Sequence, residues 1–303
     1  MTRLVLHEVG PPDRPQMERA GVPTAAKEAW IRRVLAAGLD IVQVGSFVHP
    51  EKVPQMADTD ELFRRLSADR PAGGVLSGLV LNEKGLERGL ACGVEMFCVG
   101  ASASETHSRK NTGMGTDEAV RRIVATAKEA VAAGRAVQVS VQSAFGCGFE
   151  GPIPEERVLG MVRAYLEAGL RQISLADTAG HAHPTQVERL FSAVKALAPD
   201  VECTCHFHNT YGLGMANVYA AVRAGVTSIE TSFAGLGGCP FTKVAAGNVA
   251  TEDVVHALQR EGLREDVDLG ALVAIARDVA AHFGRDLPGF VHKTGPIAVK
   301  ERT

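Results

Sequence analysis

Short apolar runs rich in β-branched residues alternate with longer amphipathic segments along the whole chain. The apolar runs predict eight strands: Leu4–Val9, Asp40–Gly45, Gly74–Leu79, Glu95–Gly100, Ala136–Gln142, Gln172–Ala176, Val201–His206 and Thr227–Thr231. Ala-rich stretches between them predict helices: Thr24–Ala37, Thr116–Ala133, Pro154–Ala168, Pro184–Leu197 and Ala216–Ala224. Four of these stretches are followed by a glycine before the next strand: Gly38, Gly134, Gly169 and Gly225. Glycine favours the left-handed turn that ends a helix, so the pattern indicates repeated strand–helix units.

Continuous alternation of strands and helices predicts an α/β protein with a parallel sheet. Eight units of about 38 residues fill nearly the whole chain, which favours a closed (β/α)8 TIM barrel over an open sheet. The turn after the first strand reads Val9-Gly10-Pro11-Pro12-Asp13 and lacks the glycine fingerprint of dinucleotide-binding sheets. One further C-terminal helix is expected from about Val267 to Ala281. We therefore predict a single catalytic TIM-barrel domain over residues 1–303.

The amino acid composition excludes some classes of protein and of binding partner. Hydrophobic residues make up 46% of the chain and charged residues 22%, values that exclude a disordered protein. A net charge of −3 and only 5% aromatic residues argue against binding nucleic acid or an anionic membrane. The first residues carry no apolar signal segment, no run is long enough to span a bilayer, and the six cysteines form no CxxC pair. We expect a cytoplasmic protein with reduced thiols.

The ends of the predicted strands carry side chains that could bind a metal. His206 and His208 are two residues apart on strand seven, so both side chains project from one face. Because chemistry in such barrels sits at the C-terminal strand ends, this pair predicts a metal site rather than two polar loop residues. Asp13 and Asn248 could add oxygen ligands, although a turn residue and a helix cap are their alternative roles. Imidazole with oxygen suits Mg²⁺, Mn²⁺ or Zn²⁺.

Three further side chains are candidates for proton transfer. Asp177 follows the apolar sixth strand and could accept a substrate proton, with helix capping as the alternative role. Glu8 lies on the first strand, where a buried acid near the barrel mouth and a structural carboxylate are both open. Cys239 follows Gly235, Gly237 and Gly238 in a loop that is expected to move over a ligand. A thiol at the tip of such a loop favours a proton donor or acceptor over an inert core cysteine.

Taken together, these motifs resemble those of 3-hydroxy-3-methylglutaryl-CoA lyases, and more broadly of metal-dependent lyases and Claisen-type synthases on the same barrel. The resemblance spans nearly the whole chain. Its most specific segments are Phe233-Ala-Gly-Leu-Gly-Gly-Cys-Pro-Phe241, Ala246-Gly-Asn248 and Ala250-Thr-Glu-Asp253. Supporting segments are Ser46-Phe-Val-His-Pro50, Val53-Pro-Gln-Met56, Asp177-Thr178 and His206-Phe-His208-Asn-Thr-Tyr-Gly212.

The resemblance implies a role for each matching position. The family's metal ligands fall on Asp13, His206, His208 and Asn248, and its lid-loop cysteine falls on Cys239. The aspartate proposed to accept the substrate hydroxyl proton falls on Asp177. The implied reaction deprotonates a tertiary alcohol, breaks a carbon–carbon bond and protonates the resulting enolate. A homodimer is the assembly that the resemblance implies.

Two positions depart from the family pattern. Pro12 replaces the arginine that stabilises the developing enolate oxygen, a loss that typically costs a factor of about 10²–10³ in rate. Gln43 replaces a glutamate at the end of strand two and cannot act as a base. Arg14 could supply the missing charge. We expect Gln43, Arg14 and Gln16 to contact the substrate.

These observations leave three hypotheses. The first is a divalent-metal-dependent lyase that cleaves a 3-hydroxy-3-methylglutaryl-CoA-like substrate to acetyl-CoA and acetoacetate. The second is a diverged lyase or Claisen-type enzyme of the same barrel that acts on a different hydroxy acid. The third is a homologue that binds a metal or ligand without turnover.

Overall fold

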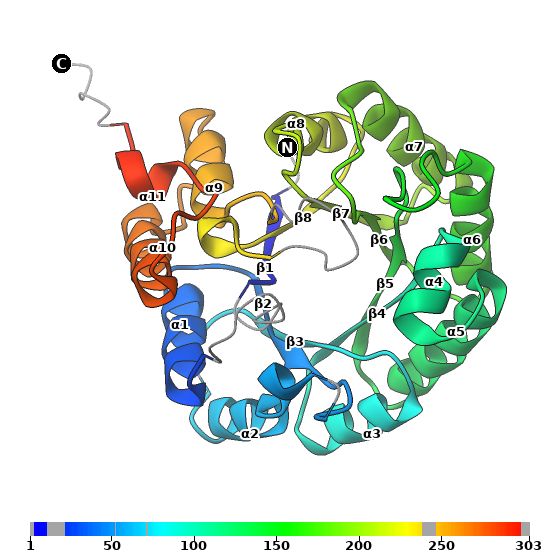
Figure 1. Cartoon of the computed structure of the whole chain (residues 1–303), viewed down its shortest axis with the longest axis horizontal. Helices are drawn as coiled ribbons and strands as arrows, with labels where there is room; N and C mark the ends of the chain where they lie inside the picture. Colours follow the sequence, from blue (N-terminus) through cyan, green and yellow to red (C-terminus); the bar gives the residue numbers. More distant parts are fainter. Residues whose placement is uncertain (1–2, 11–21, 52, 71, 238–246, 298–303) are drawn as a thin grey trace.

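The computed structural model describes residues 3–10, 22–51, 53–70, 72–237 and 247–297. Eight parallel strands close into a barrel in sequence order, and helices surround it (Figure 1). The strands are β1 (Val5–Glu8), β2 (Ile41–Ser46), β3 (Val75–Leu79), β4 (Met96–Ser102), β5 (Ala136–Gln142), β6 (Gln172–Asp177), β7 (Glu202–Phe207) and β8 (Ser228–Thr231). All eight predicted strands and the TIM barrel are thereby confirmed.

Each strand is followed by at least one helix. The helices are α1 (Thr24–Ala36), α2 (Thr59–Ala68), α3 (Glu83–Ala91), α4 (Glu105–Thr112), α5 (Thr116–Ala132), α6 (Glu155–Glu167), α7 (Pro184–Leu197), α8 (Gly214–Arg223), α9 (Thr251–Arg260), α10 (Leu269–Phe283) and α11 (Val291–Thr294). Short 3₁₀ turns, η2 (Pro54–Met56) and η3 (Phe233–Gly235), lie in the loops after β2 and β8. The five predicted helices are confirmed within about two residues at each end.

The amino acid pattern explains both kinds of element. The strands are buried on both faces, as expected of parallel strands covered by helices, so their apolar runs are nearly continuous. Gly38, Gly134, Gly169 and Gly225 all have φ between 73° and 96°, which confirms the predicted helix-ending turns. The extra C-terminal helix is α10, which contacts α1 and α9 outside the barrel. The one-turn helix α11 beyond it has no counterpart in the sequence prediction.

The barrel interior departs from the usual filling by branched apolar side chains. Polar residues that face inward and are at least 92% buried include His7, Ser77, Gln138, Thr204 and Glu230. Their hydrogen bonds run from strand to strand across the interior. These polar residues form a layer inside the barrel, below the strand ends and the loops that follow them.

Candidate metal and acid–base site

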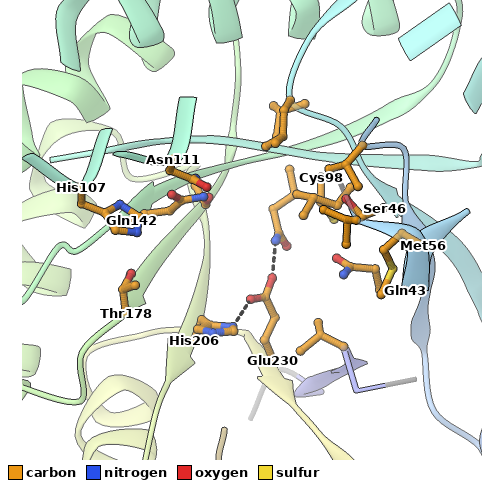
Figure 2. Close-up of a pocket in the computed structure, with 18 of the residues that line it drawn as sticks. Gln43, Ser46, Met56, Cys98, His107, Asn111, Gln142, Thr178, His206 and Glu230 are labelled. Atoms are coloured by element: carbon orange, nitrogen blue, oxygen red, sulfur yellow. Dashed lines mark hydrogen bonds and ion pairs between the residues drawn. The ribbon is translucent and has the colours of Figure 1, made fainter. Parts of the chain in front are cut away.

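A cavity of about 210 Å³ lies at the carboxyl ends of the strands. Polar side chains from α4, β5 and the turn after β6 line one side in Figure 2: His107, Asn111, Gln142 and Thr178. Side chains from β2, η2 and β4 line the other side: Gln43, Ser46, Met56 and Cys98. His206 and Glu230 lie together between these two sides. Among the described lining residues, Glu230 is the one carboxylate and no lysine or arginine occurs.

The two predicted metal-binding histidines both line this cavity. His206 is on β7 and His208 follows directly after it, and their ring centroids are 5.2 Å apart. Nδ1 of His206 lies 2.7 Å from Oε2 of Glu230, so Nε2 is the ring nitrogen that remains for a ligand. The structure thus brings the pair together, as its spacing on the strand predicted.

Asn248 is brought beside His208 from a distant part of the chain. Its backbone pairs with that of His208 in an antiparallel bridge, although the two residues are 40 positions apart. Its Oδ1 atom is buried and has no hydrogen-bond partner among the described residues. The N-cap residue of the next helix, α9, is Ala250. The alternative role of Asn248 as a helix cap is therefore wrong.

A divalent cation fits this donor set. A buried amide oxygen without a partner loses hydrogen-bond energy unless a cation or donor approaches it. Two imidazoles and an amide oxygen are ligands that Mg²⁺, Mn²⁺ and Zn²⁺ accept. In the described ranges no cluster of three His, Cys, Asp or Glu side chains could hold a metal, since Asn248 is an amide and Asp13 lies outside those ranges.

Asp177 is the last residue of β6 and is fully buried. Its Oδ1 accepts a hydrogen bond from the backbone of His181 at 2.8 Å, and its Oδ2 accepts one from Ala182 at 3.0 Å. Burial raises the pKa of Asp177 to about 6, against the lowering effect of these two bonds. The capping position of α7 belongs to His183, so Asp177 anchors the preceding loop instead of capping the helix. Asp177 is absent from the described cavity lining, so its predicted role as a general base, which a pKa near 6 would suit, stays a prediction.

Glu8 is fully buried below the loops and is absent from the cavity lining. Its Oε1 accepts hydrogen bonds from the backbones of Gly10 at 2.7 Å and Phe233 at 3.1 Å, and its Oε2 accepts one from Thr251 Oγ1 at 2.5 Å. A Cβ atom at Gly10 would lie 2.5 Å from this carboxylate, so the close approach requires glycine. Glu8 therefore ties together the segments that follow β1, β8 and Asn248. Its predicted catalytic role stays a prediction.

We expect the ionisation of Glu8 to lower the free energy of unfolding as the pH rises. Burial raises the pKa of Glu8 from 4.5 to about 8, so this contribution is complete below pH 4.5 and is lost as pH rises toward 8. Glu8→Gln stays neutral and removes this dependence. The free energy of unfolding of Glu8→Gln minus that of the wild type should therefore rise between pH 5 and 8, by at most about 1.4 kcal/mol per pH unit. Urea unfolding at several pH values measures this slope.

The matched control is Glu202→Gln, which changes an exposed carboxylate on β7 that accepts a hydrogen bond from Gln172. Its difference from the wild type should stay flat over the same range. Parallel slopes for Glu8→Gln and Glu202→Gln would show that Glu8 is already ionised in the folded protein.

Gln43 projects into the cavity from β2 and is 5% exposed. Ser46 lies on the same side of the cavity (Figure 2), and its Oγ atom is buried without a hydrogen-bond partner among the described residues. A buried hydroxyl without a partner favours contact with a polar ligand. Contact between Gln43 and the substrate stays a prediction.

Several predicted site residues lie outside the described ranges. They are Pro12, Asp13, Arg14, Gln16 and Cys239. The five cysteines that the structure describes are all buried: Cys92, Cys98, Cys147, Cys203 and Cys205.

The sequence reasoning missed three polar residues below the histidines: His7, Gln138 and Glu230. Burial alone would raise the pKa of Glu230, but its bonds with His206 and Gln138 and the nearby His7 hold it below the ordinary value. The sequence did hold one sign of this network: Glu230 is a charged residue within a strand that is expected to be buried. A buried charge requires partners inside the barrel.

Comparisons with known proteins identify the family of the chain. The model of the HMGL-like family matches residues 3–279, most of the chain. The chain belongs to the HMGL-like family. The hydroxymethylglutaryl-CoA lyase of Bacillus subtilis is 35% identical over 94% of this chain and 95% of its own length. The (R)-citramalyl-CoA lyase of Chloroflexus aurantiacus is 36% identical over 98% of this chain and 96% of its own length. This HMGL-like protein is thus a carbon–carbon lyase.

Solved structures agree with this assignment. The HMG-CoA lyase of Acinetobacter baumannii, solved in complex with coenzyme A and 3-methylmalate, has a TM-score of 0.91 and 35% identity. It is similar over 99% of this HMGL-like chain and 98% of its own chain. In the part of the chain that the structure describes, no helix combines the length and apolar character needed to cross a membrane.

Proposed function

We propose that this lyase cleaves a 3-hydroxy-3-methylglutaryl-CoA-like thioester to acetyl-CoA and acetoacetate with the help of a divalent metal. The observation that carries the proposal is the pair His206 and His208 at the cavity, with Asn248 paired to the backbone of His208 and its buried amide oxygen without a partner among the described residues. The names of the relatives support a coenzyme A thioester as the substrate class.

Each step of the proposed reaction has a candidate residue in this chain. His206, His208 and Asn248, together with Asp13, would hold the metal. When bound, a divalent metal would act as a Lewis acid that favours loss of the hydroxyl proton. Asp177, with its pKa raised to about 6, would accept that proton, and the carbon–carbon bond then breaks to leave the acetyl-CoA enolate.

The remaining residues would bind and complete the reaction. The Gln43 amide and Ser46 hydroxyl offer neutral hydrogen-bonding groups to the acyl part of the substrate. Cys239 would donate a proton to the enolate carbon, and the glycines before it would let its loop close and exclude water. Arg14 and Gln16 are further candidates for contact with the substrate.

A second candidate function is cleavage of a different hydroxyacyl-CoA. It is favoured by Gln43, a neutral amide in the cavity where the family carries a glutamate, and by the absence of lysine and arginine from the described lining. The similarity to a citramalyl-CoA lyase over nearly the whole chain supports the same alternative.

A panel of thioesters separates the two functions. Purified protein with Mg²⁺ or Mn²⁺ would receive 3-hydroxy-3-methylglutaryl-CoA, citramalyl-CoA and a 3-hydroxyglutaryl-CoA with a longer 3-alkyl group. The first function predicts the highest kcat/KM for the 3-methyl substrate. A kcat/KM at least about tenfold higher for another thioester, equal to about 1.4 kcal/mol in transition-state binding, would establish the second.

We expect Cys239→Ala to slow turnover while leaving metal affinity unchanged. Loss of a positioned proton donor typically lowers the rate by a factor of about 10²–10⁴. The measurement is kcat for release of acetyl-CoA, with a Mn²⁺ titration on the same sample. Cys205→Ala, which changes a buried thiol outside the cavity lining, is the control. An unchanged kcat for Cys239→Ala would remove the cysteine from the reaction.

A further inference from the structure

We propose that Glu230 is a positioning residue that fixes the ring orientation and tautomer of His206 for metal binding. This inference rests on the proposed role of His206 as a metal ligand. It adds a residue from β8 to which the family resemblance assigned no role.

The strand register places Glu230 between two histidines. In the barrel, Glu230 on β8 is the register partner of His206 on β7 and of His7 on β1. Side chains at paired positions of neighbouring parallel strands project from the same face of the sheet. The three residues thus form one row inside the barrel, and Glu230 and His206 also line the cavity. Figure 2 shows their side chains directed toward one another.

The carboxylate is held by donors on two sides. Oε2 lies 2.7 Å from Nδ1 of His206, and Oε1 accepts a hydrogen bond from Nε2 of Gln138 at 2.5 Å. Because a carboxylate only accepts, this bond sets the orientation of the Gln138 amide, whose Oε1 accepts a hydrogen bond from Thr204 Oγ1 at 3.1 Å. Nδ1 of His7 is 3.7 Å from Oε1 of Glu230, beyond hydrogen-bond range, while its Nε2 pairs with Ser77 Oγ at 2.9 Å.

This arrangement sets the tautomer of His206. A carboxylate only accepts hydrogen bonds, so the proton of the neutral imidazole must lie on Nδ1. Nε2 then keeps the lone pair that a metal needs. A carboxylate behind a metal-binding histidine also raises the basicity of the ring, and its loss typically lowers metal affinity by a factor of about 10–100.

Glutamine at position 230 would remove the negative charge behind His206. Its single acceptor oxygen could still accept from Nδ1 of His206, but its amino group would face Nε2 of Gln138, so the Gln138 amide would have to flip. Glu230→Gln therefore tests the charge of the carboxylate, which raises the basicity of the His206 ring. Glu230→Asp keeps the charge but shortens the side chain by one methylene, so it should recover part of the effect.

The test is binding of Mn²⁺ alone, measured from the free Mn²⁺ signal in electron paramagnetic resonance titrations. The Kd should rise about 10–100-fold for Glu230→Gln, and less for Glu230→Asp. Glu202→Gln on β7 is the matched control and should leave the Kd unchanged. Circular dichroism and thermal unfolding establish that each variant is folded before titration.

A second readout needs no variant of Glu230. In the metal-free wild type, ¹⁵N spectra of labelled histidines should show His206 as the tautomer protonated on Nδ1, with the signal assigned from its absence in His206→Gln. A neutral His206 protonated on Nε2 would overturn the inference even if Glu230→Gln failed to fold.

The outcomes also separate this inference from the proposed function. Loss of Mn²⁺ binding in His208→Ala with an unchanged Kd in Glu230→Gln would overturn the role of Glu230 and leave the metal site standing. Unchanged Mn²⁺ binding in both variants would overturn the metal site, and the inference with it. Weaker binding in both, with the Nδ1 tautomer in the wild type, supports the role of Glu230.

Discussion

Replacing His208 by alanine is expected to abolish both metal binding and cleavage of the thioester. His208 lines the cavity beside His206, and its backbone pairs with that of Asn248, so it lies at the centre of the proposed donor set. Losing a residue that supports a ligand lowers affinity about 10–100-fold, and losing a ligand itself should exceed about a hundredfold. Titration with Mn²⁺ and assay of acetyl-CoA release on the same protein measure both effects.

His183→Ala provides the matched control for this prediction. His183 is exposed at the start of α7, and its side chain makes no capping bond. The control should bind metal and turn over like the wild type. Stoichiometric metal in His208→Ala would contradict the ligand assignment.

Pro12→Arg should raise kcat for 3-hydroxy-3-methylglutaryl-CoA by a factor of about 10²–10³. Proline offers neither charge nor a side-chain donor to the developing enolate oxygen, whereas the family's arginine offers both. The described cavity lining also contains no lysine or arginine that would compensate. The gain should appear in kcat, because the added charge acts most strongly on the enolate that forms in the reaction.

Pro15→Arg tests whether any added positive charge in this segment suffices. It also replaces a proline by arginine but lies three positions away in the sequence. We expect no comparable gain from it. An unchanged kcat in Pro12→Arg would mean that another group, such as Arg14, already supplies the charge.

The fold could be predicted because its signals are local. Eight β-branched runs define the strands, and glycines such as Gly38 and Gly169 mark where helices end, since both features depend on neighbouring residues alone. Placement of His206 and His208 on one side of the chain follows from the two-residue repeat of a strand. The closeness of their rings could be predicted for the same reason.

The support beneath the site could not be predicted, because it depends on register between distant strands. Glu230 meets His206 and His7 only once β8 has closed the barrel between β7 and β1. Likewise, Glu8 bonds to Thr251 across 243 positions of sequence, and nothing local to either residue marks that contact. Isolated buried polar residues indicate that partners exist, but the fold decides which.

The most direct test of the central claim is the product stoichiometry of the wild-type protein. Metal-free protein would receive 3-hydroxy-3-methylglutaryl-CoA with and without added Mg²⁺ or Mn²⁺, and acetyl-CoA and acetoacetate would be quantified together. We predict that both products form in a one-to-one ratio, that formation requires the metal, and that His208→Ala forms neither. Absence of both products from a folded, metal-loaded sample would contradict the account.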